Sequence, residues 1–316
     1  MSGMFWYLVK RLLASAPTLI AVLTVVFVIV RIIPGDPALT VLGDQATPAA
    51  LAALRTKLGI DKPLHLQYVD FMLSALQGDL GRSLVSGRPV INEVTAVLPH
   101  TLDLTISSLL LGSAIGIPLG IWAALRRNRL ADYVIRIVSL IGLSFPVFVS
   151  GIFLLLVFAL QYRIFPVIGT SDLANLGDRA WKLVLPTLTL GLVMVAYITR
   201  VTRSAMLQVL SEDYVRTARA KGVPARLVIT RHALRNALIP VVTVVGLYLG
   251  INIGNSVLTE IVFNRPGLGK VIVTALNQRD YAMLQGLMVI YCFLIVVTNL
   301  LTDLTYGLID PRVKQS

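Results

Sequence analysis

The sequence is poor in charged residues, in cysteine and in histidine. Only 14% of its 316 residues are Asp, Glu, Lys or Arg, whereas about a quarter is usual in soluble domains. Together with 56% hydrophobic residues and a mean hydropathy of +0.81, this shortage predicts an integral membrane protein. The single cysteine, Cys292, excludes an intrachain disulfide, and the three histidines are too scattered to indicate a metal site.

A complete nucleotide-binding motif is also missing. The segment PGLGK at 266–270 resembles part of a phosphate loop, but Asn264 stands where the first glycine belongs and Val271 replaces the final Ser or Thr. The apolar runs hold no nucleophile or metal-ligand cluster, and no nucleic-acid-binding motif accompanies the basic residues. We therefore expect a non-catalytic chain that holds no cofactor itself and binds no nucleic acid.

Long apolar runs dominate what is present. A span of the bilayer core needs about 20 apolar residues at about 1.5 Å per residue. The first run is not expected to be a cleaved signal peptide, because the small residues Ala14-Ser15-Ala16 open the run instead of closing it. The sequence predicts an all-α membrane protein with six transmembrane helices, at 12–33, 102–125, 134–160, 183–203, 239–261 and 283–307.

The longest polar section, residues 34–100, follows the first span. Two prolines and a glycine at 34–37 end that span. Thr47 followed by Pro48 is a favourable helix start, so we expect short helices at 48–58 and 64–77. Five basic residues are balanced by six acids in this section, as is typical of a loop on the external side.

The distribution of Lys and Arg predicts the orientation. Sixteen of the 28 basic residues lie near the two termini, after the second span, and from the end of the fourth span to the start of the fifth. By the positive-inside rule these segments are cytoplasmic, including the loop 204–238 and the tail 311–316. We expect residues 34–100 and 263–282 on the external side, with residues 101–310 forming the membrane core.

Small and polar residues mark the second and fifth spans. Glycine recurs at every fourth position from 112 to 120 and from 246 to 254, a spacing that favours close helix contact. Asn252 and Asn255 lie within the second ladder, and Glu260 ends the same span. Polar side chains inside a span face either a partner helix or a water-filled path. Path lining and plain packing are therefore both open for these three residues.

The most informative segment is the basic stretch between the fourth and fifth spans. Residues 213–220 are good helix formers with acids first and bases last, an order that suits the helix dipole. Gly222 predicts a turn after this helix, and Pro224 prevents direct continuation. A second helix is expected over about Ala225–Ala237. This helix–turn–helix predicts a compact element whose exposed end can dock in a groove of a soluble partner.

The same stretch resembles a known family. EDYVRTARAKGV followed by RHALRNALIP is similar to the EAA-type loop of bacterial ABC importer membrane subunits, and most similar to permeases of the dipeptide/oligopeptide type. Further segments agree in order along nearly the whole chain. They are VRIIPGDPA, LGIDKPLHLQY, GDLGRS, LPHTLDL and FNRPGLGKVIVTALNQRDY.

The resemblance implies a type I ABC importer permease fold in a bacterial inner membrane. It implies a second permease subunit as partner, two ATPase subunits that bind ATP and Mg²⁺ on the cytoplasmic side, an external substrate-binding protein, and surrounding lipid. It also implies that a coupling helix docks in an ATPase cleft. The residues carried over to that role are Glu212, Asp213, Tyr214, Arg216, Thr217, Ala218, Arg219, Ala220, Lys221 and Gly222.

The expected function is passage of dipeptides or oligopeptides delivered by the external binding protein. Nickel chelates, glutathione-like peptides, opines and oligosaccharides are alternatives, because similar permeases carry them. A secondary transporter is a further alternative, but it would place charged residues near the middle of the membrane and pair interrupted helices. The mid-span regions here are nearly free of charge.

Overall fold

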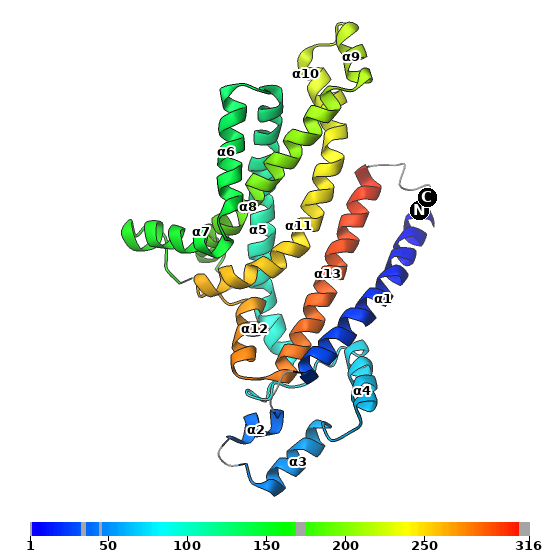
Figure 1. The fold of residues 1–316 in the computed structure, drawn as a ribbon, viewed down its shortest axis with the longest axis vertical. Coiled ribbons are helices and arrows are strands. Elements are labelled where there is room, and N and C mark those ends of the chain that lie inside the picture. The colour runs from blue at the N-terminus through cyan, green and yellow to red at the C-terminus, as the bar shows by residue number, and fades with distance from the viewer. Residues whose placement is uncertain (1, 33–35, 44–45, 169–174, 310–316) are drawn as a thin grey trace. The chain divides into compact units, whose positions relative to one another are not determined.

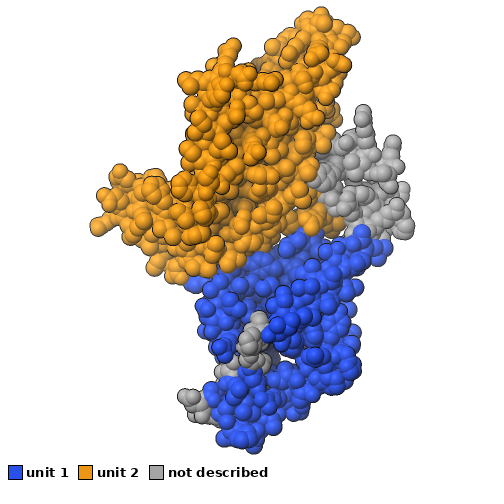
Figure 2. Space-filling view, in the orientation of Figure 1, with its two compact units in different colours: residues 1–99, 267–297 blue, residues 100–266, 298–316 orange. Residues whose placement is uncertain are grey.

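The structure is a computed structural model that describes residues 2–32, 36–43, 46–168 and 175–309 (Figure 1). Its regular elements within these ranges are helices. The chain forms two compact units, coloured in Figure 2. Unit 1 comprises residues 1–99 and 267–297, and unit 2 comprises residues 100–266 and 298–316.

The predicted all-α membrane fold is confirmed. Five helical stretches of the described residues are long and apolar enough to cross a membrane, and a bent pair of helices makes a sixth if it is counted as one span. The stretches belong to α1 (Ser2–Ile32), α5 (Val90–Leu125), α8 (Leu176–Leu210), the run from α10 (Ala225–Leu227) through η3 (Val228–Ala233) to α11 (Leu234–Val262), and α13 (Tyr281–Ile309).

The bent pair corrects the expectation of one continuous helix over 134–160. Here α6 (Leu130–Ser144) is followed, after a bend of 99°, by α7 (Val147–Leu154) and the π-helix η2 (Leu155–Gln161). Pro146 lacks an N–H and disfavours a helical residue before it, and Phe145 is extended with φ −90° and ψ 133°. The helix therefore ends at Ser144 and restarts in a new direction.

Several predicted loop boundaries were too wide, because the helices run past the apolar segments. α5 already begins at Val90, inside the section expected as 34–100. α8 begins at Leu176, before the expected fourth span at 183–203, and continues to Leu210, inside the expected loop 204–238. A further helix, α12 (Leu268–Asn277), occupies the section expected as the loop 263–282.

Unit 2 is built on the contact between α5 and α8. A Cβ atom on Gly112 would collide with Met194, on Gly116 it would lie 2.9 Å from Ile198 Cβ, and on Gly120 it would lie 2.5 Å from Thr202 Cβ. The predicted packing role of this glycine ladder is confirmed. In the second ladder only part of the helix is engaged: a Cβ on Gly246 would collide with Thr302 of α13, whereas one on Gly254 would meet open space.

Unit 1 contains α2 (Pro37–Leu42), α3 (Pro48–Leu58), α4 (Leu64–Leu76) and α12. The helices expected at 48–58 and 64–77 are confirmed as α3 and α4, and the Thr47 hydroxyl accepts a hydrogen bond from the Ala50 N–H at 3.3 Å. Asp280, which is 2% exposed, ties the unit together. Its carboxylate accepts hydrogen bonds from the Ser83 hydroxyl and the Met283 N–H.

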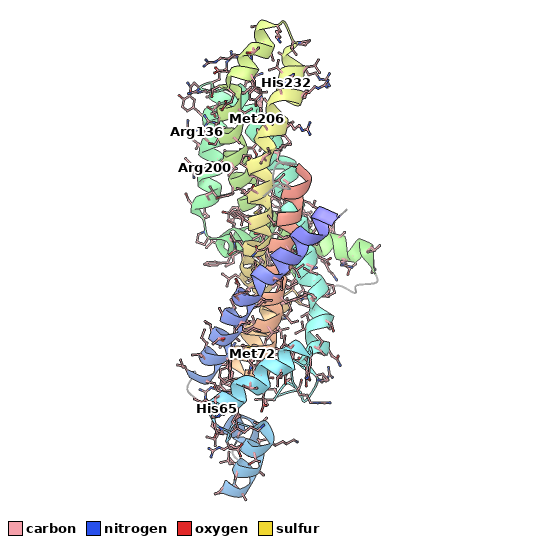
Figure 3. The ribbon with its side chains drawn as sticks, turned by 90° about the vertical axis from the view of Figure 1, so that its right-hand side faces the viewer. His65, Met72, Arg136, Arg200, Met206 and His232 are labelled. Carbon is pink, nitrogen blue, oxygen red and sulfur yellow. The ribbon has the colours of Figure 1, made fainter. Side chains whose placement is uncertain are left out.

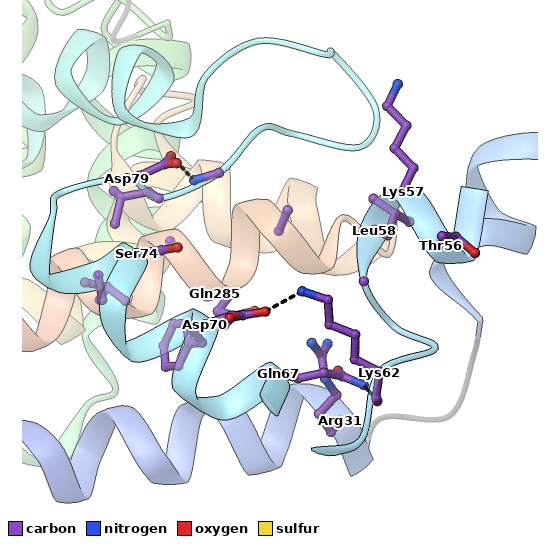
Figure 4. Close-up of a pocket in the computed structure, with 18 residues that line it drawn as sticks. Arg31, Thr56, Lys57, Leu58, Lys62, Gln67, Asp70, Ser74, Asp79 and Gln285 are labelled. Carbon is purple, nitrogen blue, oxygen red and sulfur yellow. Dashed lines mark hydrogen bonds and ion pairs between the residues drawn. The ribbon is translucent and has the colours of Figure 1, made fainter. Parts of the chain in front are cut away.

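A cavity of about 380 Å³ opens among the helices of unit 1 (Figure 4). Residues of α4 and α13 line it, together with Arg31 from the end of α1. Lys62 Nζ donates to Asp70 Oδ2 at 2.7 Å at this cavity, as Figure 4 shows. This hydrogen bond raises the pKa of the exposed Lys62 ammonium. The charges around the cavity are therefore of both signs.

Candidate functional site

The predicted docking helix is α9 (Asp213–Ala220), which lies beyond the ends of α8 and α11 in unit 2 (Figure 1). Its bounds are those expected from the sequence. Val215 and Ala218, one helical turn apart, form its buried face and pack with Val228 of η3. Val209 and Leu210 at the end of α8 complete this cluster. The apolar face therefore anchors α9 to both adjoining helices.

Gly222 makes the turn that the sequence predicted. Its φ of +77° lies in the left-handed region, where glycine carries no steric penalty. The Gly222 N–H donates to the Arg219 carbonyl at 2.9 Å, and the Val223 N–H donates to the Ala218 carbonyl at 3.2 Å. These two bonds form a Schellman C-cap, which satisfies carbonyls at the end of α9. Val223 also packs against the buried cluster of α9, as such caps commonly do.

Nine of the ten predicted docking residues are exposed, and Ala218 is not. Ala218 is 8% exposed and faces the valine cluster, so its assignment as a contact residue is corrected to an anchoring one. The physical reason is the helical period, since position 218 shares the inward face of position 215. The exposed residues are Glu212, Asp213, Tyr214, Arg216, Thr217, Arg219, Ala220, Lys221 and Gly222.

Polar contacts fix one edge of α9 to the next helix. The Tyr214 hydroxyl accepts a hydrogen bond from Asn236 Nδ2 at 2.7 Å, which joins α9 to the beginning of α11. Arg216 and Asp213 form an ion pair at 3.6 Å, but their side chains are 70% and 97% exposed. Such an exposed pair adds little stability. The charges on this surface are free to meet a partner.

The return helix, predicted over about 225–237 and leading into the fifth span, is continuous with that span. α10, η3 and α11 form one helical run from Ala225 to Val262. Pro240 lies inside α11 without ending it, as prolines in membrane helices often do when neighbours satisfy the freed carbonyl. α9 is thus joined to the C-terminal end of α8 and, through a continuous helix, to the fifth span.

The three possible path residues have different environments. Asn252 is 3% exposed and its amide donates to Ser108 Oγ at 3.4 Å. Glu260 is fully buried and accepts a hydrogen bond from the Thr101 hydroxyl at 2.6 Å. Asn255 is exposed, beside the open position of Gly254. Only Asn255 therefore faces outward from unit 2, and the other two residues connect α11 to α5.

A buried charge network near Glu260 was missed from the sequence. Arg265 is fully buried, 3.5 Å from Asp103 Oδ2, and Arg179 Nε donates to the same carboxylate oxygen at 2.6 Å. Burial lowers the pKa of the Arg265 guanidinium, and the nearby carboxylates of Asp103 and Glu260 oppose that shift. The network joins α5, α8 and the segment after α11. Its sequence signal was Asp103 inside the predicted span 102–125, where a charge requires a partner, whereas Arg179 lay outside the predicted spans.

The described residues contain no group of three or more His, Cys, Asp or Glu side chains that could hold a metal ion. Unit 2 therefore has two notable features along α8. The exposed helix α9 follows the C-terminal end of α8, and Arg179, which pairs with Asp103, lies some 30 residues earlier in α8. At about 1.5 Å per residue these two features lie about 45 Å apart.

Comparison with known families decides the identity. Residues 116–315 match the family described as binding-protein-dependent transport system inner membrane component, and residues 4–105 match the N-terminal region described for such components. This chain belongs to that family. It is a multi-pass permease component of an ABC importer.

Similar proteins agree with this assignment. The binding-protein-dependent permease described here is 41% identical over 309 residues to the glutathione transport system permease protein GsiC of Salmonella choleraesuis, with 98% of each chain covered. It is 40% identical to GsiC of Escherichia coli K12 over the same length. ABC importers work with ATPase and binding-protein partners, so such partners are implied here as well.

Solved structures show the fold of the permease core. An inward-facing MetNI methionine ABC transporter matches with a TM-score of 0.53 and 16% identity, covering 68% of this chain and 95% of that one. An amino acid ABC transporter crystallised with histidines matches with the same score and covers 69% and 94%. The type I importer permease fold is thereby confirmed for this permease.

Proposed function

We propose that this chain forms, with a second permease subunit, the path by which small peptides enter the cell. Two ATPase subunits would bind ATP and Mg²⁺, and this chain would hold neither. An external binding protein would deliver the peptide to the side of the membrane that carries residues 34–100. The similarity to glutathione permeases supports a short peptide with several carboxylates, glutathione among them.

The observation that carries the proposal is the construction of α9. A helix of 8 residues is too short to be stable alone. It is held by a buried valine cluster and a glycine cap, while nearly all its remaining side chains are exposed. That arrangement suits a helix which inserts into a groove of another protein and passes force to the two helices beneath it.

Cysteine crosslinking within the assembled transporter tests the docking. The native Cys292 is buried and is first replaced by serine. We expect Ala220→Cys and Lys221→Cys to crosslink to an ATPase subunit, whereas Ala218→Cys, which faces the valine cluster, serves as the matched buried control. Crosslinking of the control alone, or of no position on α9, would exclude this helix as the contact.

Uptake into proteoliposomes tests the substrate. We expect ATP-dependent uptake of radiolabelled glutathione or a dipeptide only when the binding protein is supplied, with each competing against the other. Uptake of a nickel chelate, an opine or an oligosaccharide instead would reject the peptide assignment. The orientation is tested separately, because Lys57→Cys and Arg127→Cys should react with impermeant reagents from opposite sides of the membrane.

A further inference from the structure

A cavity of about 380 Å³ lies between α6 and α8 in unit 2, and none of its lining residues belongs to α9 or to the Asp103 network. Figure 3 shows Arg136 and Arg200 on the same side of the described chain, one on each of these helices. The cavity is lined by Ile135, Arg136, Ser139, Leu140, Leu143, Thr199, Arg200, Arg203 and Ser204.

The charge of this cavity is strongly positive. Three arginines line it, and no acid does. Arg203 is neutralised by Asp132, with Nε 2.5 Å from Oδ1. Arg136 lies over the Tyr133 ring at 5.8 Å and interacts electrostatically with Asp132. Neither Arg136 nor Arg200 forms a direct ion pair with an acid in the part of the chain that the structure describes. One carboxylate, that of Asp132, therefore faces three guanidinium groups, and the cavity keeps a positive charge that a bound anion can balance.

A hydroxyl in the same wall is available to such an anion. Thr199 is 2% exposed, and its Oγ1 has no hydrogen-bond partner among the described residues. Leaving a buried hydroxyl unsatisfied is costly, and a bound anion offers an acceptor. The charge and the unsatisfied donor are therefore two independent signs that this cavity takes a ligand.

The cavity is amphipathic along the helix axis. α6 and α8 are antiparallel, because Asp132 meets Arg203 and Gly142 lies beside Ala196. The arginines accordingly gather toward the end of α8 that carries α9. Leu140 and Leu143 line the other end of the cavity. A ligand that fills it has an anionic head and an apolar tail.

The surface around the cavity is that of a helix in contact with hydrocarbon. Val134, Ile137, Val138 and Ile141 of α6 are 48%, 56%, 62% and 53% exposed. Arg136 lies six residues into α6, which is about 9 Å from the first residue of the helix. At that depth arginine side chains reach the lipid headgroup region. The cavity thus opens at headgroup level onto an apolar face.

We propose that this cavity binds one anionic phospholipid. Its phosphate would be held by Arg136, Arg200 and the Thr199 hydroxyl, and an acyl chain would lie along Leu140 and Leu143. Basic cavities between membrane helices hold the headgroups of anionic lipids in this way. Because the cavity adjoins the Asp132–Arg203 tie between α6 and α8, the lipid would brace the two helices near the base of α9.

Native mass spectrometry of the assembled transporter tests this proposal. The complex is reconstituted with equal amounts of phosphatidylglycerol and phosphatidylcholine before lipid is stripped by collisional activation. We expect wild-type complex to retain phosphatidylglycerol selectively. The double variant R136Q/R200Q should retain it about 30-fold less, because each arginine near a lipid phosphate contributes a factor of about five.

A matched double variant, R126Q/R127Q, removes two exposed arginines from the turn between α5 and α6 and does not touch the cavity. It should keep the wild-type retention. An equal loss of phosphatidylglycerol in both variants would mean that net charge alone determines lipid retention, and it would overturn the proposal. Displacement of the lipid by inorganic phosphate or glutathione would also overturn it, since a soluble anion would then be the ligand.

The proposal would also be overturned if a second permease subunit, and not lipid, covered this face. It would appear as a crosslink from Ile137→Cys to that subunit, together with no selective lipid retention. Assembly of each variant is verified by its mass, so a failure to fold is distinguished from a loss of lipid. R136K/R200K keeps both charges and should retain most of the lipid.

Discussion

Arg203 on α8 donates two hydrogen bonds to the carboxylate of Asp132 on α6, at 2.5 Å to Oδ1 and 2.7 Å to Oδ2. Asp132 is fully buried and also accepts from the Asn128 N–H at 3.1 Å. Paired, two-point contacts of this kind fix orientation as well as distance. The start of α6 is therefore attached to α8 at Arg203, about two helical turns before α8 ends at Leu210.

Removing one partner of this pair should destabilise the permease markedly. We expect Asp132→Asn to cost about 3 kcal/mol, because Arg203 would be left uncompensated in a largely buried site. Asp178→Asn breaks an i,i+4 pair with Lys182 in which the carboxylate is 35% exposed instead of buried, and should cost less than about 0.5 kcal/mol. Thermal unfolding of the two variants in the same detergent compares them directly. Equal midpoints would contradict the assigned role of Asp132.

A side chain at Gly222 would strain the backbone without colliding with other atoms. A Cβ there would meet no atom within 4 Å, so a substitution acts through the φ of +77° alone. Asn tolerates this region, Ala costs about 1 kcal/mol, and β-branched Val costs more. We expect transport per ATP hydrolysed to fall in the order Gly222→Asn, Gly222→Ala, Gly222→Val, with membrane insertion unchanged.

Gly59 provides a matched control for that series. It ends α3 with a φ of +67°, so Gly59→Ala introduces a comparable strain in unit 1. Its effect on coupling should be absent, since the residue belongs to unit 1 and is remote in sequence from α9, which belongs to unit 2. A loss of coupling in Gly59→Ala equal to that in Gly222→Ala would attribute the effect to general destabilisation.

Features determined by neighbouring residues were predictable from the sequence. α9, its C-terminal turn and the start of α3 depend on residues within a few positions, such as Gly222 and the pair Thr47-Pro48. The caps follow from local hydrogen bonding, which the sequence encodes directly. Burial of Ala218 was also predictable from its spacing to Val215. It was assigned to the docking surface because the family resemblance covered the whole motif.

The effect of a proline on a helix could not be predicted from the neighbouring residues alone. Pro186 and Pro240 lie inside continuous helices, whereas Pro146 coincides with a 99° bend. All three interrupt apolar runs in the sequence. What distinguishes them is whether neighbouring helices satisfy the freed backbone and hold the axis straight, which depends on packing. The sequence alone therefore places Pro146 within the third span but does not predict that the helix bends there.

The buried ion pairs depend on contacts between distant parts of the chain. Asp132 and Arg203 are 71 residues apart, and Arg179 and Asp103 are 76 apart. Taken alone, Arg203 was consistent with a topology signal, and Asp132 and Arg179 were consistent with solvated loops. Arg265 is the clearest case, because the segment after α11 was expected to be an exposed loop and its guanidinium is fully buried.

Acid should loosen the link between α2 and α3. Burial alone would raise the pKa of the Asp36 carboxyl, but hydrogen bonds from Arg55 and from the Ala38 N–H outweigh burial and lower it. Because the folded-state pKa lies below the unfolded-state value of about 3.9, this contribution is present above that pH and is lost as the pH falls through the folded-state pKa.

Pepsin cleavage within residues 36–58, followed by mass spectrometry, measures that loss. We expect cleavage to accelerate as the pH is lowered below about 4. In Asp36→Asn cleavage should be fast throughout and lack this step. Lys57→Gln removes an exposed charge from the same helix and should leave the step in place. A step that persists in Asp36→Asn would assign it to another carboxyl.

Accessibility should distinguish the two asparagines of α11 in the assembled transporter. Asn255 is exposed beside Gly254, whereas Asn252 is 3% exposed against Ser108. In a background with Cys292→Ser, we expect Asn255→Cys to react with a small water-soluble maleimide and to be protected while substrate is transported. Asn252→Cys should stay unreactive in both conditions, because α5 covers it. Reaction at 252 but not at 255 would mean that the path runs between α5 and α11 and that Asn255 faces lipid or a partner subunit.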